Sequence, residues 1–304
     1  MQLEQPTILI VDDDKHGRKL LNDLLKSDAK IVLAKNGQQA LELVNKCNPT
    51  VILMDILMPD INGFQVLEKL KANERTKNIA ILFITALDNH KDEAKGLRMG
   101  ACDYIHKPFH PDIVVARVKT HLELAKHRKM LEKLVNFDAL TAIPNRRHLE
   151  QKLESEWTNS VRTGQSIAIA MLDVDHFKIY NDHYGHAAGD QVLKRIANVL
   201  EVQLHRPRDV IARYGGEEFC IVLPDTDIEG AAFVMDKCCK AVRDLNIENI
   251  NSSASNVVSI SVGCSVVEAK QSILCDDARL FADNLLYKAK ENGRDQVQIA
   301  FFEP

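Results

Sequence analysis

Two glycines followed by two acidic residues make up the short stretch of this chain most suited to chemistry. Residues 213–219 read Arg-Tyr-Gly-Gly-Glu-Glu-Phe, and an apolar run, Cys220–Leu223, follows. Glycines between two strand-like runs favour a tight hairpin whose backbone a large ligand can approach. The adjacent carboxylates of Glu217 and Glu218 would then suit a metal ion, although many hairpins carry acidic residues for solubility alone.

A third carboxylate, that of Asp173, comes at the end of the predicted strand 167–172. If it faces the hairpin, the acids form a set suited to two divalent ions, which can polarise a phosphate and activate a hydroxyl. The last predicted helix supplies Lys290 and Arg294, which are four residues apart and would share one face. These two cations would hold the phosphates of a nucleoside triphosphate.

Asn181 and Asp190 could recognise a nucleobase. Together they offer a mixed edge of hydrogen-bond donors and acceptors, and an aspartate that accepts two N–H groups selects guanine over adenine. Taken alone, they would be a loop residue and a helix cap. The nucleobase interpretation therefore depends on the rest of the set.

Polar residues in the first third of the chain fall where predicted strands end. Asp12 and Asp13 follow the first strand, Asp55 follows the third, Thr85 follows the fourth, and Lys107 lies near the end of the fifth. The carboxyl ends of parallel strands meet at one edge of a sheet, so these side chains are expected to converge. Clustered carboxylates repel one another unless a cation lies among them, which implies a hard divalent ion such as magnesium. Each residue alone would pass for a cap or a turn former.

Short apolar runs and amphipathic segments alternate around these positions. The runs are typical of buried strands, and the segments have helical spacing. The strands are Ile8–Val11, Val51–Met54 and Ile81–Ile84, and the helices are Leu20–Leu25, Ala40–Val44, Val66–Leu70 and Ala94–Met99. This order predicts an α/β fold with a doubly wound parallel sheet.

One long helix is predicted from residue 112 to residue 137, with Val114, Val118 and Leu122 on one stripe. It is either a solvated spacer or a coiled-coil seam between two chains, with an irregular heptad. After Pro144 a second α/β domain is predicted. Its helices span 147–161, 190–204, 228–245 and 278–290, its strands include 167–172 and 257–262, and the polar stretch 249–256 is predicted to be a mobile loop.

The composition is that of a soluble globular protein. The chain has 304 residues, enough for two domains, and a net charge of −4. No strongly basic region stands out, which argues against DNA as a partner. No apolar stretch is long enough to span a membrane, and residues 1–6 do not resemble a secretory signal. Seven cysteines without a C-x-x-C pair indicate neither a disulfide framework nor a zinc site, so we expect a cytoplasmic protein.

Residues 1–122 resemble the receiver domain of bacterial response regulators, which has a flavodoxin-like fold. The matching residues are Val11-Asp12-Asp13-Asp14, Met54-Asp55, Met58-Pro59, Gly63, Thr85-Ala86 and Lys107-Pro108. The resemblance implies that Asp55 accepts a phosphoryl group from a partner histidine kinase. It also implies that Asp12, Asp13 and Asp55, with the carbonyl of Leu57, hold one magnesium ion.

The receiver resemblance implies a complete switch. The carboxylate of Asp55 would be the nucleophile, while Lys107 and magnesium neutralise charge on the transferring phosphoryl group. Thr85 would hydrogen-bond the new phosphate, and Tyr104 would rotate inward as the threonine moves. A cis peptide bond is expected at Lys107–Pro108.

Residues 138–304 resemble the GGDEF domain of diguanylate cyclases, an α/β fold of the nucleotidyl-cyclase type. The matching stretches are 138–141, 144–147, 173–178, 181–182, 185–186, 189–190, 215–219, 289–290 and 293–294. The signature is spelled GGEEF here, a form that active members also use. The resemblance implies an enzyme that joins two GTP molecules into cyclic di-GMP and releases two pyrophosphates.

The GGDEF resemblance also implies roles for individual residues. Asp173, Glu218 and the carbonyl of Val174 would bind up to two magnesium or manganese ions for each GTP, and Glu217 would help deprotonate the attacking 3′-hydroxyl. The residues implied in GTP binding are Phe177 and Lys178 through backbone amides, Lys290 and Arg294 at the phosphates, and Asn181 and Asp190 at the guanine. The string Arg206-Pro-Arg-Asp209 is a charged turn that also fits the R-x-x-D inhibitory site, where the product cyclic di-GMP would bind.

The implied reaction needs two GTP-loaded domains face to face, so we expect a homodimer. This need favours the seam interpretation of the long helix, whose residues 123–137 would be a linker that passes the receiver's state to the cyclase. The alternative is a catalytically weak GGDEF domain that only senses GTP or cyclic di-GMP under receiver control. Ala142, Ile143 and Asp295 depart from the usual glycine, leucine and asparagine, which affects the expected loop geometry but no metal or guanine contact.

Overall fold

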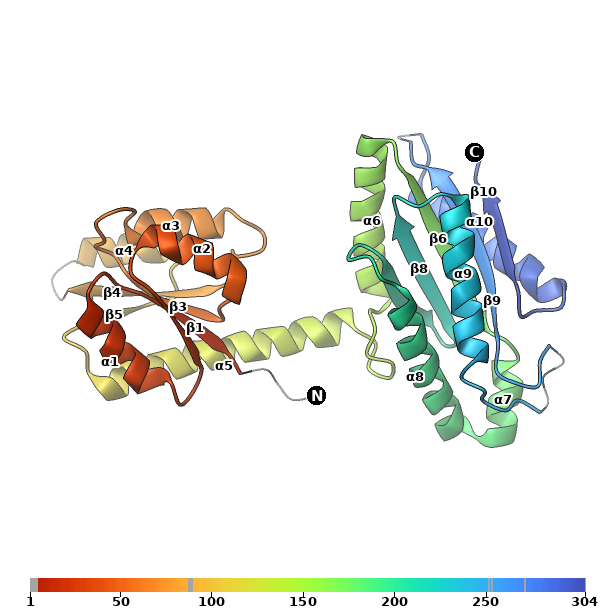
Figure 1. Ribbon diagram of the computed structural model, residues 1–304, viewed down its shortest axis with the longest axis horizontal. Coiled ribbons are helices and arrows are strands. Elements are labelled where there is room, and N and C mark those ends of the chain that lie inside the picture. Colours follow the sequence, from red (N-terminus) through yellow and green to blue (C-terminus); the bar gives the residue numbers. More distant parts are fainter. Residues whose placement is uncertain (1–4, 87–89, 251, 253, 271, 304) are drawn as a thin grey trace. The chain divides into compact units, whose positions relative to one another are not determined.

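The computed structural model describes residues 5–86, 90–250, 252, 254–270 and 272–303. Contacts along the chain divide it into two compact units, Met1–Leu131 and Glu132–Pro304. Each unit contains one five-stranded sheet, and helix α5 (Pro111–Asn136) runs from the first unit into the second (Figure 1). Among the described residues, no helix is both long and apolar enough to cross a membrane.

The first unit is a doubly wound sheet of parallel strands. Its other elements are β1 (Thr7–Val11), α1 (Lys15–Leu25), β2 (Lys30–Ala34), α2 (Gly37–Cys47), β3 (Val51–Asp55), α3 (Gly63–Lys71), β4 (Ala80–Ala86), α4 (His90–Met99) and β5 (Asp103–Lys107). The strand order β2-β1-β3-β4-β5 is that of flavodoxin-like folds. Helices α1 and α5 cover one face of the sheet, and α2, α3 and α4 cover the other (Figure 1). The predicted fold class is confirmed.

Strands β2 and β5, whose ranges the sequence pattern did not define, form the two edges of this sheet. The central strands β1 and β3 are buried along almost their whole length and therefore read as continuous apolar runs. Strand β2 is only partly buried and begins with a lysine. An edge strand has a neighbour on one side only, so its sequence carries a weaker signal.

Side-chain caps fix where two of the helices begin. Asp14 accepts hydrogen bonds from the amides of His16 and Gly17 at the start of α1, and Asn62 and Gln65 form a capping box at α3. The third of the three consecutive aspartates therefore caps a helix. Asp12 and Asp13 are left at the end of the strand.

Helix α5 confirms the predicted long helix to within one residue at each end. Val114 and Val118 are buried in the core of the first unit. Further along, Leu124, Leu131 and Leu134 are 56%, 61% and 75% exposed. The C-terminal half of the helix thus presents large apolar side chains to solvent.

The second unit is a mixed sheet with helices on both faces. Its elements are α6 (Arg146–Thr163), β6 (Ser166–Val174), α7 (Phe177–Tyr184), α8 (His186–Gln203), β7 (Val210–Gly215), β8 (Glu218–Pro224), α9 (Ile228–Arg243), β9 (Ile260–Glu268), α10 (Cys275–Glu291) and β10 (Val297–Phe301). The strand order is β10-β9-β6-β8-β7, with only β9 and β10 parallel. One core lies between the sheet and α7, α8 and α9, and the other lies beneath α6 and α10.

The second unit differs from the sequence prediction at several boundaries. Helix α8 begins at His186 rather than at residue 190, and strand β9 spans 260–268 rather than 257–262. The short helix α7 and the strand β10 were not predicted. Residues 251 and 253 of the predicted mobile loop lie outside the described part of the chain.

Candidate functional site

The two glycines lie in a hairpin, as predicted. Strand β7 ends at Gly215 and β8 begins at Glu218, and these two residues pair across the ladder. Gly216 has a φ of 54°, in the left-handed region that glycine adopts without strain. A Cβ atom added to either glycine would meet no described atom within 4 Å. The space over the turn is open, so a large ligand can approach this backbone closely.

Asp173 and Glu218 are partners in the antiparallel register of β6 and β8, the central pair of strands next to the hairpin. Asp173 is largely buried, with 8% of its surface exposed, and Lys290 Nζ from α10 lies 2.9 Å from its Oδ2. Glu217, in the turn itself, is half-buried. Asp173 therefore lies beside Glu218 of the hairpin, and it also contacts Lys290, which the sequence pattern assigns to the phosphates of a nucleotide.

Burial first, and repulsion between neighbouring carboxylates second, make the ionised acids of this site unfavourable. Burial raises the pKa of Asp173 to about 6, against the opposing effect of Lys290, and the charges of Glu217 and Glu218 add to the rise. Burial also raises the pKa of Glu218, and repulsion from the nearby Asp283 carboxylate raises it further. Divalent cations would relieve this repulsion, so the donor set fits metal binding.

Helix α7 begins at Phe177, shortly after β6 ends at Val174. The amides of Phe177 and Lys178 open the helix, where N–H groups have no helical acceptor and suit an anion. Burial lowers the pKa of His176, the residue before them, and the positive charge of Arg294 lowers it further. Arg294 therefore acts electrostatically on the turn at which α7 begins.

The helical argument for Lys290 and Arg294 is wrong. Helix α10 ends at Glu291, so Arg294 lies beyond it and the two cations do not share a helical face. Gly293 follows with a φ of 106°, a conformation that ends helices. Arg294 comes near the α7 turn by way of this loop.

Asn181 on α7 packs directly against α8. A Cβ atom on Gly189 would lie 1.8 Å from Asn181 Oδ1, so any larger residue there would displace the Asn181 side chain. This oxygen is buried and accepts no hydrogen bond from the described residues. Asp190 is exposed in the second turn of α8, whose N-cap is Gly185, so it is not the helix cap that was the alternative reading. An unpaired acceptor and an exposed carboxylate beside it suit a hydrogen-bonding ligand such as a nucleobase.

In the first unit, Asp12, Asp13 and Asp55 offer three carboxylate oxygens within 4.8 Å of one another. Asp12 is fully buried, and burial raises its pKa. Within the described ranges this is the only group of three such residues close enough to share an ion. The set fits one hard divalent cation. The amide of exposed Leu57 donates to Asp55 Oδ1 at 3.0 Å, which places its backbone beside this cluster.

Lys107 completes the cluster. Its Nζ lies 2.6 Å from Asp55 Oδ2 and 3.0 Å from Asp12 Oδ2. Burial alone would lower the pKa of Lys107, but hydrogen bonds and attraction from Asp55 and Asp12 hold it above its usual value. The peptide bond between Lys107 and Pro108 is cis, as expected.

Thr85 and Tyr104 lie on the neighbouring strands β4 and β5, and both are buried. The ring of Tyr104 lies 5.6 Å from that of Phe83, between ring centres. Its hydroxyl stands so near Gly96 that a Cβ atom there would come within 2.0 Å of it. Tyr104 is therefore already turned inward in this structure.

Comparisons with known proteins bear on both halves of the chain. Residues 8–119 match the family described as "Response regulator receiver domain", and residues 135–296 match "Diguanylate cyclase, GGDEF domain". The second match covers more than half of the chain. The chain belongs to the GGDEF family. It combines a receiver domain with a GGDEF domain in that order.

Relatives of this GGDEF protein match most or nearly all of its length. Response regulator PleD of Caulobacter vibrioides is 27% identical over 298 residues, or 95% of this chain and 65% of PleD. Diguanylate cyclase DgcP of Pseudomonas aeruginosa is 34% identical over 69% of this chain and 29% of DgcP. The chain thus spans less than two thirds of the length of these relatives.

A solved structure supports the fold of the GGDEF half. The coiled coil and GGDEF domain of DgcB from Caulobacter crescentus, in complex with c-di-GMP, aligns with a TM-score of 0.54 and 27% identity. The alignment covers 62% of this chain and 98% of that one. The fold class expected for the GGDEF half is therefore confirmed.

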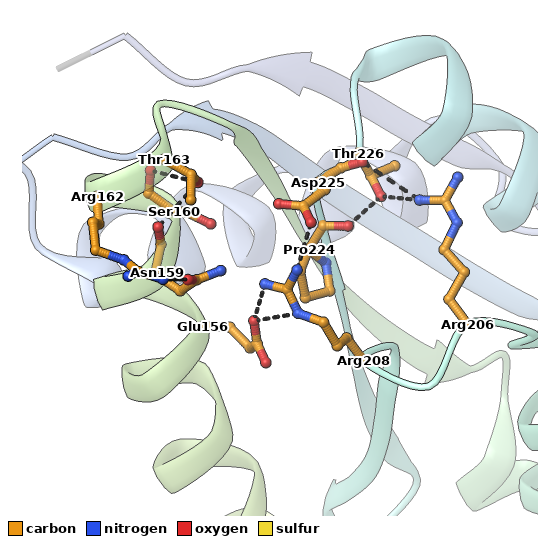
Figure 2. Close-up of polar contacts among 10 residues, drawn as sticks. All are labelled: Glu156, Asn159, Ser160, Arg162, Thr163, Arg206, Arg208, Pro224, Asp225 and Thr226. Atoms are coloured by element: carbon orange, nitrogen blue, oxygen red, sulfur yellow. Dashed lines mark hydrogen bonds and ion pairs between the residues drawn. The ribbon is translucent and has the colours of Figure 1, made fainter.

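The R-x-x-D string of the GGDEF domain forms the turn before β7, at the opposite end of that strand from Gly215. Arg206 Nη1 donates to Thr226 Oγ1 at 3.2 Å and to the carbonyl of Asp225 at 3.4 Å (Figure 2). Asp209 Oδ2 accepts from the amide of Arg206 at 3.3 Å, and burial raises the pKa of Asp209. Its other oxygen, Oδ1, is buried without a hydrogen bond from the described residues. The pair therefore forms a polar group separate from the hairpin site.

Arg208, inside the same string, holds the turn in place. It forms ion pairs with Glu156 on α6 and with Asp225 after β8 (Figure 2). These contacts join segments separated by 52 and 17 positions in the sequence. The R-x-x-D turn is thus fixed to two other parts of the GGDEF domain.

One part of the GGDEF framework was not assigned a role from the sequence. Asp138 Oδ1 accepts from the amide and hydroxyl of Thr141 at 2.9 and 2.7 Å and from Arg213 Nη1 at 3.0 Å. Arg213 Nε also donates to the carbonyl of Gly216 at 2.8 Å. Burial would raise the pKa of Asp138, but these partners hold it below its usual value. The turn after α5 is thereby joined to the hairpin.

Asp138→Ala is expected to lower the free energy of unfolding of the GGDEF domain by about 2 kcal/mol, because three donors lose a half-buried acceptor. For a domain of this size that corresponds to a fall in Tm of roughly 6 °C. Asp236→Ala, at an exposed position of α9, is the matched control and should change Tm little. Equal Tm values for the two variants by calorimetry would contradict the assignment.

Two of the departures from the usual family residues adopt left-handed backbone. Ala142 has a φ of 62° and Asp295 a φ of 46°, at positions where glycine and asparagine are usual. Ile143, by contrast, is 1% exposed and belongs to the core, where it replaces leucine at similar volume. The fold accepts all three residues.

Proposed function

We propose that the protein is a phosphorylation-regulated diguanylate cyclase that condenses two GTP molecules into cyclic di-GMP. The observation that carries the proposal is the register pairing of Asp173 with Glu218 beside an open glycine turn, with Lys290 at 2.9 Å. Membership of the GGDEF family supports it.

In the proposed reaction the 3′-oxygen of one GTP attacks the α-phosphorus of the other, and pyrophosphate leaves. In a second attack, the 3′-oxygen of the other nucleotide joins the α-phosphorus of the first, and a second pyrophosphate leaves as the ring closes. Glu217, half-buried in the turn, would accept the hydroxyl proton. Magnesium or manganese ions, held by Asp173, Glu218 and the carbonyl of Val174, would supply charge stabilisation at the phosphates.

The remaining residues of the site would bind and orient GTP. Lys290 and Arg294 would pair with phosphate oxygens, and the amides of Phe177 and Lys178 would donate to them. The unpaired Oδ1 of Asn181 and the carboxylate of Asp190 would accept from the guanine edge.

Because each domain would hold one GTP, the reaction requires two chains. Leu124, Leu131 and Leu134 of α5 are exposed and spaced by seven and three residues, as in a coiled-coil seam. A homodimer paired along this helix would bring two GGDEF domains together.

The receiver would control this pairing. A histidine kinase would transfer a phosphoryl group to Asp55, with one magnesium ion held by Asp12, Asp13, Asp55 and the carbonyl of Leu57. Lys107 already contacts Asp55 and would pair with the phosphoryl oxygens, and Thr85 would donate to them. Tyr104 is buried beside Gly96 of α4, and its rotation would transmit phosphorylation of Asp55 to this helix.

Incubation of the protein with GTP and Mg²⁺, with and without a small-molecule phosphoryl donor, tests this function. We expect cyclic di-GMP and pyrophosphate in a 1:2 ratio, formed faster with the donor. If the protein binds GTP but forms no product in either condition, the cyclase proposal is wrong, and the alternative of a nucleotide-sensing domain is favoured. Equal rates in both conditions would contradict control by phosphorylation but not the proposed cyclase activity.

Arg206→Ala is expected to raise the product concentration that halves the rate at least about 10-fold, because a bidentate guanidinium contact to phosphate or guanine would be lost. Its present partners, Thr226 and the Asp225 carbonyl, are neutral and weakly held at 3.2 and 3.4 Å, so the side chain can move to a ligand. Initial rates at increasing cyclic di-GMP measure the effect. Arg195→Ala on α8 is the control, and an unchanged inhibition curve for Arg206→Ala would refute the site.

A further inference from the structure

A buried carboxylate lies beside the proposed GTP site without a role in it. Asp175 is 1% exposed and stands directly after β6, two residues beyond Asp173. An ionised carboxylate in such a place costs several kcal/mol unless donors surround it. Its hydrogen bonds therefore indicate what it holds in place.

Donors from two separate segments converge on Asp175. Ser261 Oγ, on β9, donates to Oδ1 at 2.6 Å, and Ser259 Oγ, just before β9, donates to Oδ2 at 2.7 Å. The amide of Asp295, after α10, donates to Oδ2 at 3.1 Å. Both serines are buried as well. One side chain thus fastens the ends of β6 and β9 to the loop after α10.

That loop has an unfavourable backbone. Arg294 and Asp295 have φ angles of 64° and 46°, and consecutive non-glycine residues in the left-handed region cost free energy. The Asp295 carboxylate pairs with Arg243 on α9 at 2.7 Å, and the Gln296 side chain donates to loop carbonyls, among them that of Asn292 at 2.8 Å. Of these anchors, only the bond to Asp175 leads back to the strand that carries Asp173.

We propose that Asp175 is a positioning residue for GTP. It holds the amide of Asp295, and hence the adjoining Arg294, at a fixed place relative to the metal-binding end of β6. Asp175 touches neither nucleotide nor metal and acts through the loop. The inference rests on the proposed cyclase function and deepens it by linking the phosphate contact to the acid pair.

Two substitutions of Asp175 distinguish the effect of its hydrogen bonds from the effect of its side-chain packing. Asp175→Ala removes both acceptors and leaves three donors without a partner. Asp175→Asn can turn its amide so that the oxygen accepts from Ser259 and Asp295 while the nitrogen donates to Ser261. For the full chain, we expect Asp175→Ala to raise the KM for GTP at least about 10-fold, with a smaller fall in kcat, and Asp175→Asn to stay within about 3-fold.

Amide hydrogen exchange without nucleotide provides a second readout. Residues 290–296 should exchange faster in Asp175→Ala than in the wild type, and Asp175→Asn should restore protection. Asp295→Asn is the matched control, because it loses the pair with Arg243 but keeps the backbone amide that Asp175 binds. Its KM should stay close to that of the wild type.

A folded Asp175→Ala variant with unchanged KM and unchanged exchange at 290–296 would overturn the inference. If this variant does not fold, the double variant Ser259→Ala/Ser261→Ala removes two of the three donors, and an unchanged KM there would overturn it equally. A wild-type protein that binds no GTP would instead overturn the proposed function. In that case the exchange at 290–296 still decides whether Asp175 anchors the loop.

Discussion

Asp173→Asn is expected to lower the rate of cyclic di-GMP formation at least about 1000-fold, which corresponds to about 4 kcal/mol of transition-state stabilisation. Asn keeps the size of the side chain but offers one neutral oxygen in place of a carboxylate, so the pair with Glu218 could no longer hold divalent ions. Lys290 would also lose the anion that positions it at 2.9 Å. Pyrophosphate release at saturating GTP measures the loss.

The same substitution should not weaken the fold. The pKa of Asp173 is raised to about 6 from a usual 3.8, so the ionised group is unfavourable in the folded state. The protonated Asp173 therefore contributes to the free energy of unfolding: the contribution is full below pH 3.8 and is lost as the pH rises through 6, a change of roughly 3 kcal/mol. Without added metal at pH 7.5, Asp173→Asn should therefore melt at the same temperature as the wild type or higher, and the difference should shrink at pH 5.

Opposite effects on activity and stability distinguish this prediction from general damage. Asp236→Asn, the same change at an exposed position of α9, should alter neither quantity. A rate within about 10-fold of the wild type for Asp173→Asn would remove Asp173 from the proposed metal site.

Asp55→Asn is expected to abolish both phosphoryl transfer to the receiver and the stimulation of cyclase activity by a phosphoryl donor. The amide oxygen is not a nucleophile comparable to the carboxylate, and it weakens the contact with Lys107, whose Nζ lies 2.6 Å from Asp55 Oδ2. The ratio of rates with and without donor should fall to about one, since nothing else in the proposed switch takes up phosphate.

Intact mass of the protein after treatment with donor and Mg²⁺ measures the transfer directly. Asp23→Asn is a matched control, because Asp23 lies on α1 with an exposed side chain that contacts its close neighbours in sequence, Asn22 and Lys26. If the Asp55→Asn variant is still phosphorylated and still stimulated, the phosphoryl acceptor is a residue other than Asp55. Phosphorylation of the wild type without stimulation would instead separate the receiver from the cyclase.

Local sequence patterns predicted much of the architecture, because each depends on residues close together in the chain. The apolar runs around β1, β3, β4 and β6, the hairpin at Gly215 and Gly216, and the length of α5 all follow from the period of burial or from turn chemistry. Acids directly after strands converge because parallel strands end at one edge. The edge strand β2 and the short helix α7 carried weaker signals, since they bury less surface or span few residues.

Spacing failed where a helix ended earlier than the pattern suggested. Lys290 and Arg294 are four residues apart, but Gly293 ends the regular structure between them, and Arg294 reaches the α7 turn by a left-handed loop instead. Likewise, Asp190 had the character of a helix cap until α8 proved to begin one turn earlier.

What the sequence by itself determined were the types of groups and their local settings: two sets of acids at strand ends, each with a lysine from a later segment, and a glycine turn between two strands. Only the tertiary structure decided which groups meet. Lys107 contacts Asp55, Lys290 contacts Asp173, Arg213 contacts Asp138, and Asp175 binds Asp295 across 120 positions. Such pairs depend on strand order and register, which are fixed by burial of the whole core, so no short stretch of sequence contains them.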